Sequence, residues 1–112
     1  MEKWQIKYWC DAAKQSPIQK WLDGLEEDQL KSISKELIML EITGNMLRLP
    51  HSRALGQGLF ELRDIRYGLR IYYGFHGRQI IIVVAAGDKG GQEKDIKMAR
   101  NRLSQTKSEE KL

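Results

Sequence analysis

The chain divides into a first half in which apolar residues recur at helical spacing and a second half in which they alternate or run together. Residues 4–9 alternate between apolar and polar side chains and predict a short strand. Ser16-Pro17 is typical of a helix start, so we expect a hairpin of two helices: a short one ending at Gly24, and one from Glu26 to Thr43 that ends at Gly44. Their apolar stripes are Ile18, Trp21, Leu22 and Leu25, and Leu30, Ile33, Leu37 and Leu40.

The second half of the chain predicts three strands and one further helix. Residues 59–63, 69–75 and 79–86 are strand-like and are separated by turn-prone segments. The last helix is expected to bury Ile96, Ala99 and Leu103. The order strand, helix, helix, three strands, helix predicts one α+β domain over residues 1–103, built around an antiparallel sheet. Residues 104–112 are polar and predict a disordered tail.

Length and composition fit a single cytoplasmic domain. The chain has 112 residues and a formal net charge of +4, which is room for one hydrophobic core. Its longest apolar run, Ile80 to Ala86, is far shorter than the ~20 residues that span a bilayer, and residues 1–5 show no signal-peptide pattern. With one cysteine, Cys10, no intrachain disulfide can form, which fits a reducing compartment.

The positive charge is concentrated in the second half of the chain. Residues 1–43 hold six basic and eight acidic side chains, whereas residues 44–89 hold seven basic and three acidic ones. The basic residues between positions 44 and 88 are all arginines: Arg48, Arg53, Arg63, Arg66, Arg70 and Arg78. The planar guanidinium group suits paired contacts with phosphate oxygens. The pattern therefore favours a polyanionic partner, and the alternative is an ordinary solvated surface that uses arginine.

Strand alternation predicts that some of these arginines share one face of the sheet. If Phe60 and Leu62 point to the core, Glu61 and Arg63 point the other way. The same argument places Arg70 and Tyr72 opposite the apolar face of the next strand. We therefore expect these four side chains to cluster on one open face. They form either a binding site or a simple cross-strand pair in which Glu61 neutralises an arginine.

A second cationic position lies where the last strand turns into the last helix. Lys89 sits in Gly87-Asp88-Lys89-Gly90-Gly91, and a lysine beside a helix N-terminus would favour an anion. The alternative is an ordinary strand-to-helix turn. No metal site is expected, because His51 and His76 lie 25 residues apart without further ligands at metal-binding spacing.

Several blocks of the sequence resemble the RelE/ParE superfamily of toxins. The runs Leu55-Gly56-Gln57-Gly58-Leu59-Phe60-Glu61-Leu62-Arg63 and Tyr67-Gly68-Leu69-Arg70-Ile71-Tyr72-Tyr73 are similar to its Gly-Leu-(Phe/Tyr)-Glu-Leu-Arg and Tyr-Arg-(hydrophobic)-Tyr blocks. Two further blocks resemble the HigB-like "addiction module killer" branch of this superfamily. They are Gly87-Asp88-Lys89 with Gln92-Glu93-Lys94-Asp95-Ile96, and Trp21-Leu22-Asp23-Gly24-Leu25. The likeness covers residues 4–103, which is nearly the whole chain.

The resemblance implies the toxin of a type II toxin–antitoxin system. The implied fold is RelE-like, with a curved antiparallel sheet flanked by the helical hairpin and the C-terminal helix. The implied activity is metal-independent, ribosome-dependent cleavage of mRNA, which inhibits translation and requires no cofactor. The implied partners are mRNA, the ribosome and a helix-turn-helix antitoxin, with operator DNA reached only through the antitoxin and no membrane contact.

The resemblance also implies roles for individual residues. Arg63 and Arg70 match basic residues on the family's site face, and Lys89 matches the basic position after the last strand. Glu61 and His51 are the candidates for the base. The residues expected to bind RNA are Arg48, Arg53, Arg66, Tyr72 and Lys97.

Three departures from the family pattern leave other functions open. Glu61 stands where the RelE type has lysine, Gly90-Gly91 replaces a Ser/Thr-rich turn, and the family's catalytic histidine or tyrosine near the last strand has no counterpart. The alternatives are a ParE-like toxin that binds DNA gyrase and a non-catalytic module that only binds its partner protein.

Overall fold

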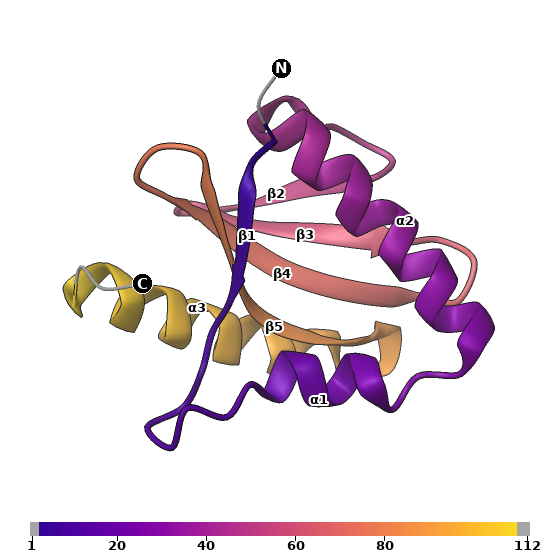
Figure 1. The fold of residues 1–112 in the computed structure, drawn as a ribbon, viewed down its shortest axis with the longest axis horizontal. Helices are drawn as coiled ribbons and strands as arrows, with labels where there is room; N and C mark the ends of the chain where they lie inside the picture. The colour runs from indigo at the N-terminus through magenta and orange to yellow at the C-terminus, as the bar shows by residue number, and fades with distance from the viewer. Residues whose placement is uncertain (1–2, 110–112) are drawn as a thin grey trace.

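The computed structural model describes residues 3–109 of the chain, which form one sheet with helices on both of its faces (Figure 1). In chain order the elements are β1 (Gln5–Tyr8), α1 (Pro17–Asp23), α2 (Glu27–Thr43), the 3₁₀ turn η1 (Gly44–Met46), β2 (Ser52–Gly56), β3 (Leu59–Asp64), β4 (Leu69–His76), β5 (Ile80–Asp88), the 3₁₀ turn η2 (Lys89–Gly91) and α3 (Gln92–Glu109). The predicted α+β class is confirmed.

The sheet differs from the prediction in one strand and one pairing. Its order is β1-β5-β4-β3-β2, so it has five strands rather than four. The additional strand, β2, lies at an edge and has mostly exposed side chains, so its sequence carries little apolar alternation. The pairs from β2 to β5 are antiparallel, but β1 runs parallel to β5. The prediction of an antiparallel sheet was therefore wrong at β1.

The first two helices begin and end close to the predicted positions. Ser16 caps α1 by accepting a hydrogen bond from the backbone N–H of Gln19 at 3.1 Å, and Pro17 is the first residue of the helix. The helix α2 ends at Gly44, whose φ of +56° favours glycine. A Cβ at Gly44 would lie 2.0 Å from the indole nitrogen of Trp4, so this helix end also packs tightly against the segment before β1.

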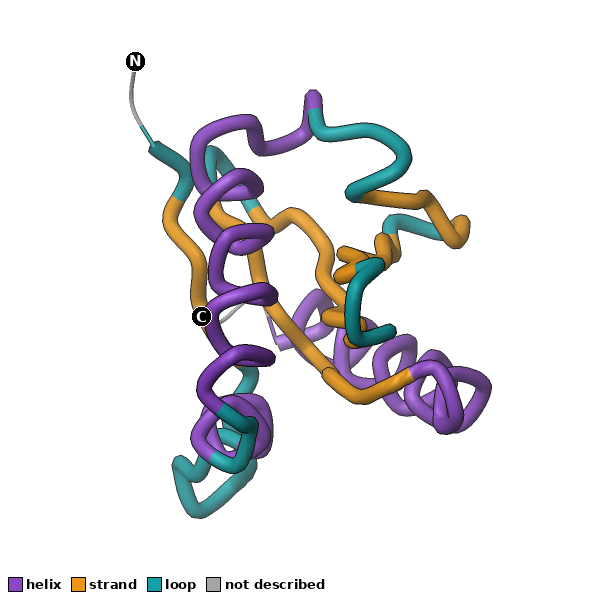
Figure 2. The backbone as a smooth tube through the Cα atoms, turned by 90° about the vertical axis from the view of Figure 1, so that its right-hand side faces the viewer, coloured by secondary structure: helices purple, strands orange, loops and turns teal. Residues whose placement is uncertain are grey.

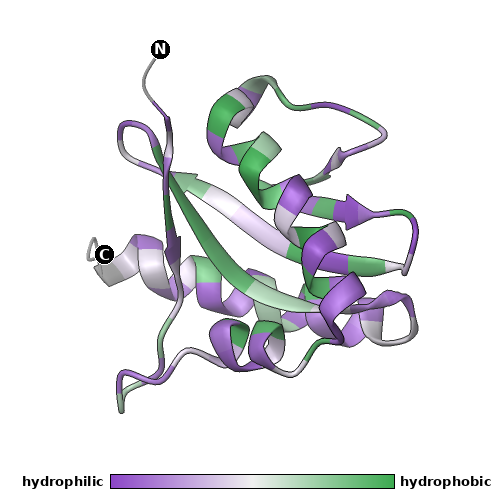
Figure 3. Cartoon of the chain, turned by 45° about the vertical axis from the view of Figure 1, so that its right-hand side comes forward, coloured by the Kyte–Doolittle hydropathy of each residue, from purple (hydrophilic) through white to green (hydrophobic). Residues whose placement is uncertain are grey.

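Two hydrophobic clusters lie on opposite faces of the sheet. Helices α1 and α2 cover one face, and the buried residues of this cluster include Ile18, Ile33, Leu40, Leu62, Ile71 and Val83. The single helix α3 covers the other face (Figure 2), where Ala99 and Leu103 pack against Leu59, Tyr72 and Val84. The strand β5 contributes to both clusters, which explains its almost continuous hydrophobic colour in Figure 3.

The last helix is longer than expected. Ala99 and Leu103 are buried as predicted, and Ile96 is partly buried. The helix continues through residues 104–109, which the polar composition had assigned to a disordered tail, and Thr106 is buried within that stretch. Residues 110–112 of the predicted tail lie outside the described residues. No helix within residues 3–109 is both long and apolar enough to span a membrane.

Candidate phosphate-binding site

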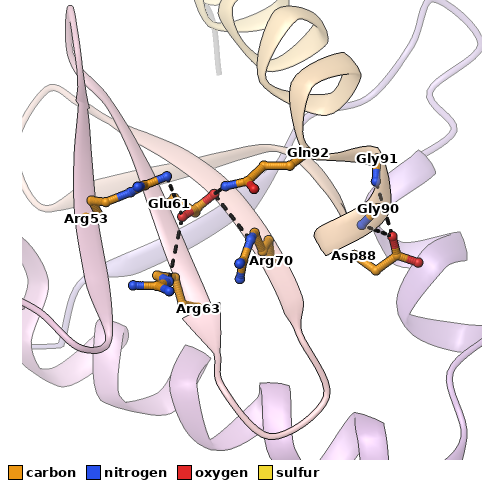
Figure 4. A network of polar contacts seen from close by, with 8 residues as sticks. All are labelled: Arg53, Glu61, Arg63, Arg70, Asp88, Gly90, Gly91 and Gln92. Atoms are coloured by element: carbon orange, nitrogen blue, oxygen red, sulfur yellow. Dashed lines mark hydrogen bonds and ion pairs between the residues drawn. The ribbon is translucent and has the colours of Figure 1, made fainter.

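A buried carboxylate, Glu61 of β3, lies at the centre of a cluster of charged side chains on the sheet (Figure 4). Its side chain is completely buried. Glu61 Oε1 lies 3.2 Å from Nη2 of Arg53 and 3.8 Å from Nε of Arg63, and Oε2 lies 3.5 Å from Nε of Arg70. The side-chain amide of Gln92 donates a hydrogen bond of 2.6 Å to Oε2. We call Glu61, Arg53, Arg63, Arg70 and Gln92 the arginine cluster.

Strand register explains how residues distant in sequence meet here. Glu61 lies opposite Arg53 on β2 and opposite Tyr72 on β4, and Arg63 lies opposite Arg70. Because side chains of opposed residues leave the same side of a sheet, these residues share one face. The predicted gathering of Glu61, Arg63, Arg70 and Tyr72 is thus confirmed.

The expectation that this face is open was wrong, because α3 crosses it. Glu61 and Tyr72 have no exposed surface, and the Arg70 side chain is only 8% exposed. The side chains of Arg63 and Arg53 are 31% and 45% exposed. The cluster is therefore buried at its centre and reaches solvent on the β2 side through these two arginines.

The cluster has more positive than negative charge and unsatisfied donors. Three guanidinium groups face a single carboxylate. The Nε atoms of Arg63 and Arg70 are buried and form no hydrogen bond among the described residues, and neither does Oε1 of Glu61, so these arginines contact the carboxylate as ion pairs only. Buried polar groups left in this state are unusual in folded proteins and are often part of functional sites.

The outer ends of two arginines are directed away from the carboxylate. Arg63 and Arg70 face Glu61 through Nε, and Figure 4 shows their terminal nitrogens pointing away from it. Glu61 thus fixes the inner side of two guanidinium groups on neighbouring strands while their outer donors remain for another anion. Such paired, oriented donors suit the oxygens of a phosphate group.

The turn that contains Lys89 is organised differently from the expected anion site. Asp88 accepts hydrogen bonds from the backbone N–H groups of Gly90 at 2.9 Å and Gly91 at 3.3 Å, so the chain's own carboxylate occupies these donors. Lys89 is exposed and lies beside the turn between β3 and β4, since a Cβ at Gly68 would be 3.7 Å from the Lys89 Cβ. Lys89 is therefore near the end of the sheet that carries Arg63 and Arg70.

Two candidate residues lie apart from the arginine cluster. His51 Nδ1 lies 2.7 Å from Oε1 of Glu36 on α2, the helix that covers the opposite face of the sheet. Arg48 donates to two backbone carbonyl oxygens of its own loop, Asn45 at 2.7 Å and Leu47 at 3.2 Å. Through these contacts, His51 and Arg48 stabilise the segment that precedes β2.

The remaining candidates divide by exposure. Arg66 is exposed in the β3–β4 turn, with its Cζ 5.3 Å from the centre of the Tyr67 ring, and Lys97 is exposed on α3. Tyr72 is buried, and both this burial and the negative charge of Glu61 raise the pKa of its hydroxyl group. Tyr72 therefore has no surface on which a base could stack.

Sequence reasoning did not identify Gln92 as part of the site. Gln92 is the first residue of α3, and in the sequence it stood only in the block that resembles the HigB-like branch, with no role of its own. Its contact with Glu61 depends on how α3 packs on the sheet, which no local pattern specifies. Asp95 lies one turn later on α3, close to the backbone of Gly87. Burial of its carboxyl group, and secondly the negative charge of Asp88, raise the pKa of Asp95.

The described part of the chain contains no group of three or more histidine, cysteine, aspartate or glutamate side chains placed to hold a metal ion. The chemistry that the arginine cluster can supply is the binding of an anion and the stabilisation of developing negative charge.

Comparison with known protein families shows what the chain is similar to. Residues 20–104 match the family described as phage derived protein Gp49-like (DUF891). This range includes α2, all strands except β1, and most of α3. A search of the curated proteins found no match.

Proposed function

The chain belongs to the phage-derived Gp49-like family, and from that premise we propose that it is the toxin of a type II toxin–antitoxin system that cleaves mRNA. Membership of this family is consistent with a toxin role. The resemblance of its sequence blocks to the HigB-like branch of the RelE/ParE superfamily supports the same role. The observation that carries the proposal is the arginine cluster, with two guanidinium groups held side by side by a buried carboxylate.

The proposed reaction is transfer of a phosphoryl group within the RNA strand. The 2′-oxygen attacks the adjacent phosphorus, a 2′,3′-cyclic phosphate forms, and the bond from phosphorus to the 5′-oxygen breaks. The proton of the 2′-hydroxyl passes to water, and the departing 5′-oxygen takes up a proton from water. Arg63 and Arg70 would stabilise the negative charge that builds on the phosphate oxygens, and loss of one such donor costs ~10²–10³-fold in rate.

Glu61 is assigned a positioning role rather than the role of a base. Its carboxylate is fully buried and in contact with three arginines and Gln92, so no substrate hydroxyl can reach it in this arrangement. His51 faces Glu36 and lies on the other side of the sheet. Without a base in the cluster, alignment of the mRNA by the ribosome would supply much of the acceleration.

The proposed regulator is a helix-turn-helix antitoxin, as the resemblance implies. Exposed apolar side chains on the outer surface of α2 and the segment after it support a protein partner: Ile38 is 54% exposed, Ile42 51% and Met46 68%. Ile38 and Ile42 are one helical turn apart. Grouped apolar side chains of this kind are typical of surfaces that bind another protein.

A cell-free translation assay with preformed mRNA tests the proposal. The wild-type protein is expected to stop synthesis and to leave shortened transcripts, whereas Arg63→Ala should lose at least about 100-fold in potency. Lys35→Gln, a change at an exposed residue of α2, serves as the matched control and should behave like wild type. Unimpaired translation in the presence of folded wild-type protein would contradict the proposal and favour a gyrase-binding toxin.

A further inference from the structure

The hydrogen bond from Gln92 differs in kind from the other contacts of the Glu61 carboxylate. The Gln92 amide donates to Oε2 at 2.6 Å. Within residues 3–109, Oε1 accepts no hydrogen bond, and the Nε atoms of Arg63 and Arg70 donate none. The three arginines of the cluster therefore contact the carboxylate as ion pairs, at 3.2–3.8 Å. In the described part of the chain, a neutral amide makes the one hydrogen bond to this buried charge.

This arrangement is the reverse of what the strengths of the donors favour. A guanidinium group makes a shorter and stronger hydrogen bond to a carboxylate than a neutral amide does, and it often makes two in parallel. Arg70 Nε nevertheless stays 3.5 Å from Oε2, the oxygen atom that carries the amide of Gln92. An amide bonded to Oε2 takes up one lone pair of that oxygen, so Gln92 competes with Arg70 for the same acceptor.

The end of β5 and the turn after it determine where the Gln92 side chain starts. β5 pairs with β4 up to its last residue, and Gly87 lies opposite Arg70. Asp88 then caps the following turn, η2, by accepting hydrogen bonds from two of its backbone N–H groups. Helix α3 begins directly after this turn, and Figure 4 shows the Gln92 side chain extending from there to Glu61. The amide is thus anchored next to the strand that carries Arg70.

Removal of the amide would change what Arg70 does. Oε2 would become a free acceptor on a fully buried carboxylate, and a buried charge without hydrogen bonds is unfavourable. Arg70 can supply the missing bond by closing onto the carboxylate through Nε and one terminal nitrogen, the paired geometry that arginine favours. That terminal nitrogen now points away from Glu61 (Figure 4) and would no longer be available to a phosphate group.

We propose that Gln92 is a positioning residue for the RNA cleavage. Its amide satisfies Oε2 of Glu61, so Arg70 is held by charge and keeps its outer donors directed at the phosphate. Gln92 itself touches neither the RNA nor the reacting atoms. The inference rests on the proposed function, because it takes Arg70 as a group that stabilises the phosphate. The alternative is a purely structural role, in which the hydrogen bond only stabilises the packing of α3.

The kinetic test follows cleavage of a preformed mRNA on ribosomes at increasing protein concentrations. Gln92→Met keeps the length of the side chain without its donor, so the maximal rate should fall at least about tenfold. The half-saturating concentration should change less than about twofold, because the exposed basic residues that attract RNA remain. Thr106→Val is the matched control. It removes a hydrogen bond of 2.9 Å to the carbonyl oxygen of Arg102 within the same helix and should cleave like wild type.

A second variant separates the rate from stability. Gln92→Glu replaces the donor by an acceptor that draws the arginines toward itself, so its maximal rate should fall at least as far as that of Gln92→Met. Its melting temperature should fall less, because the three arginines and the N-terminus of α3 both favour a negative charge there. A purely structural role predicts instead that the rate follows the melting temperature.

An NMR measurement tests the geometry without RNA. The Nε–H signals of Arg63 and Arg70 can be assigned from their loss in Arg63→Lys and Arg70→Lys. In wild type, Arg70 Nε–H makes no hydrogen bond to Glu61. In Gln92→Met this group should donate to the carboxylate, so its proton signal should move downfield and its exchange with water should slow. Thr106→Val should leave the signal unchanged.

The possible failures are distinguishable. If wild type cleaves mRNA and Gln92→Met reaches the same maximal rate, the positioning role is overturned and the proposed function stands. An unchanged Arg70 Nε–H signal in Gln92→Met, or an equal loss of rate in Thr106→Val, would also overturn the positioning role alone. If folded wild-type protein leaves the mRNA intact on ribosomes, the proposed function is overturned, and the positioning role falls with it.

Discussion

The side-chain amide of Gln92 donates a hydrogen bond of 2.6 Å to the carboxylate of Glu61, which connects the first residue of α3 to the centre of the arginine cluster. The contact joins residues 31 positions apart in the sequence. It makes the packing of α3 and the arrangement of the arginines interdependent, because displacement of the helix would remove a donor from the buried carboxylate.

The first prediction concerns this contact. Gln92→Met keeps the length of the side chain but removes the donor, so the unfolding free energy should fall by ~1.5–3 kcal/mol, the range for a hydrogen bond to a charged group. Gln19→Met is the control, since Gln19 donates to Asp23 on the surface of α1 and should cost no more than ~0.5 kcal/mol. Urea denaturation measures both, and equal small losses would contradict a structural role for the Gln92 contact.

The second prediction concerns the buried charge. Glu61→Gln leaves Arg70 buried opposite a neutral amide, and the loss of one partner of a buried ion pair should cost ~3 kcal/mol or more. Arg53→Gln removes a partner whose side chain is 45% exposed and should cost ~1 kcal/mol or less. Thermal unfolding of the two variants checks this order, and the reverse order would show that Glu61 does not hold the cluster together.

The third prediction concerns pH. Burial and the nearby charge of Asp88 raise the pKa of Asp95 above its ordinary value of 3.8. The folded protein therefore holds this proton more tightly than the unfolded chain, and the stability gained below the ordinary pKa is lost as the pH rises through the raised one. Since asparagine has no proton to lose, the stability of Asp95→Asn relative to wild type should increase from about pH 4 to about pH 7.

Denaturation of wild type and Asp95→Asn at several pH values measures this trend. Asp28→Asn is the matched control, because Asp28 is an exposed acidic residue in the first turn of α2, as Asp95 is in the first turn of α3. A stability of Asp95→Asn relative to wild type that stays level or falls as the pH rises would contradict the account of Asp95.

Strand periodicity predicted much of the candidate site. Alternation along residues 59–63 and 69–75 placed Glu61, Arg63, Arg70 and Tyr72 on one face, and the register confirms it. This succeeded because side-chain direction in a strand follows from position alone. The start of α1 and the ends of α1 and α2 could also be predicted from the sequence. Ser16, Gly24 and Gly44 set these boundaries through contacts within the adjacent helical turn, so no distant residue is needed.

The parts that sequence reasoning missed depend on packing between distant elements. The helix α3 covers the arginine face, which no periodicity in residues 92–109 specifies, and so Arg70 and Tyr72 are buried rather than open. The edge strand β2 has exposed side chains and little apolar alternation, so Arg53 was not linked to Glu61. His51 contacts Glu36, a residue 15 positions earlier on another element.

The most direct test of the central claim is to map transcript 5′ ends in cells that express the wild-type chain or Arg63→Ala without an antitoxin. Arg63 is the better choice than Arg70, because its side chain is partly exposed and its loss should disturb folding less. The account predicts new 5′ ends within coding sequences for the wild type and their near absence for a stably expressed Arg63→Ala. The same cleavage pattern for both proteins, or growth arrest by the wild type without new 5′ ends, would contradict it.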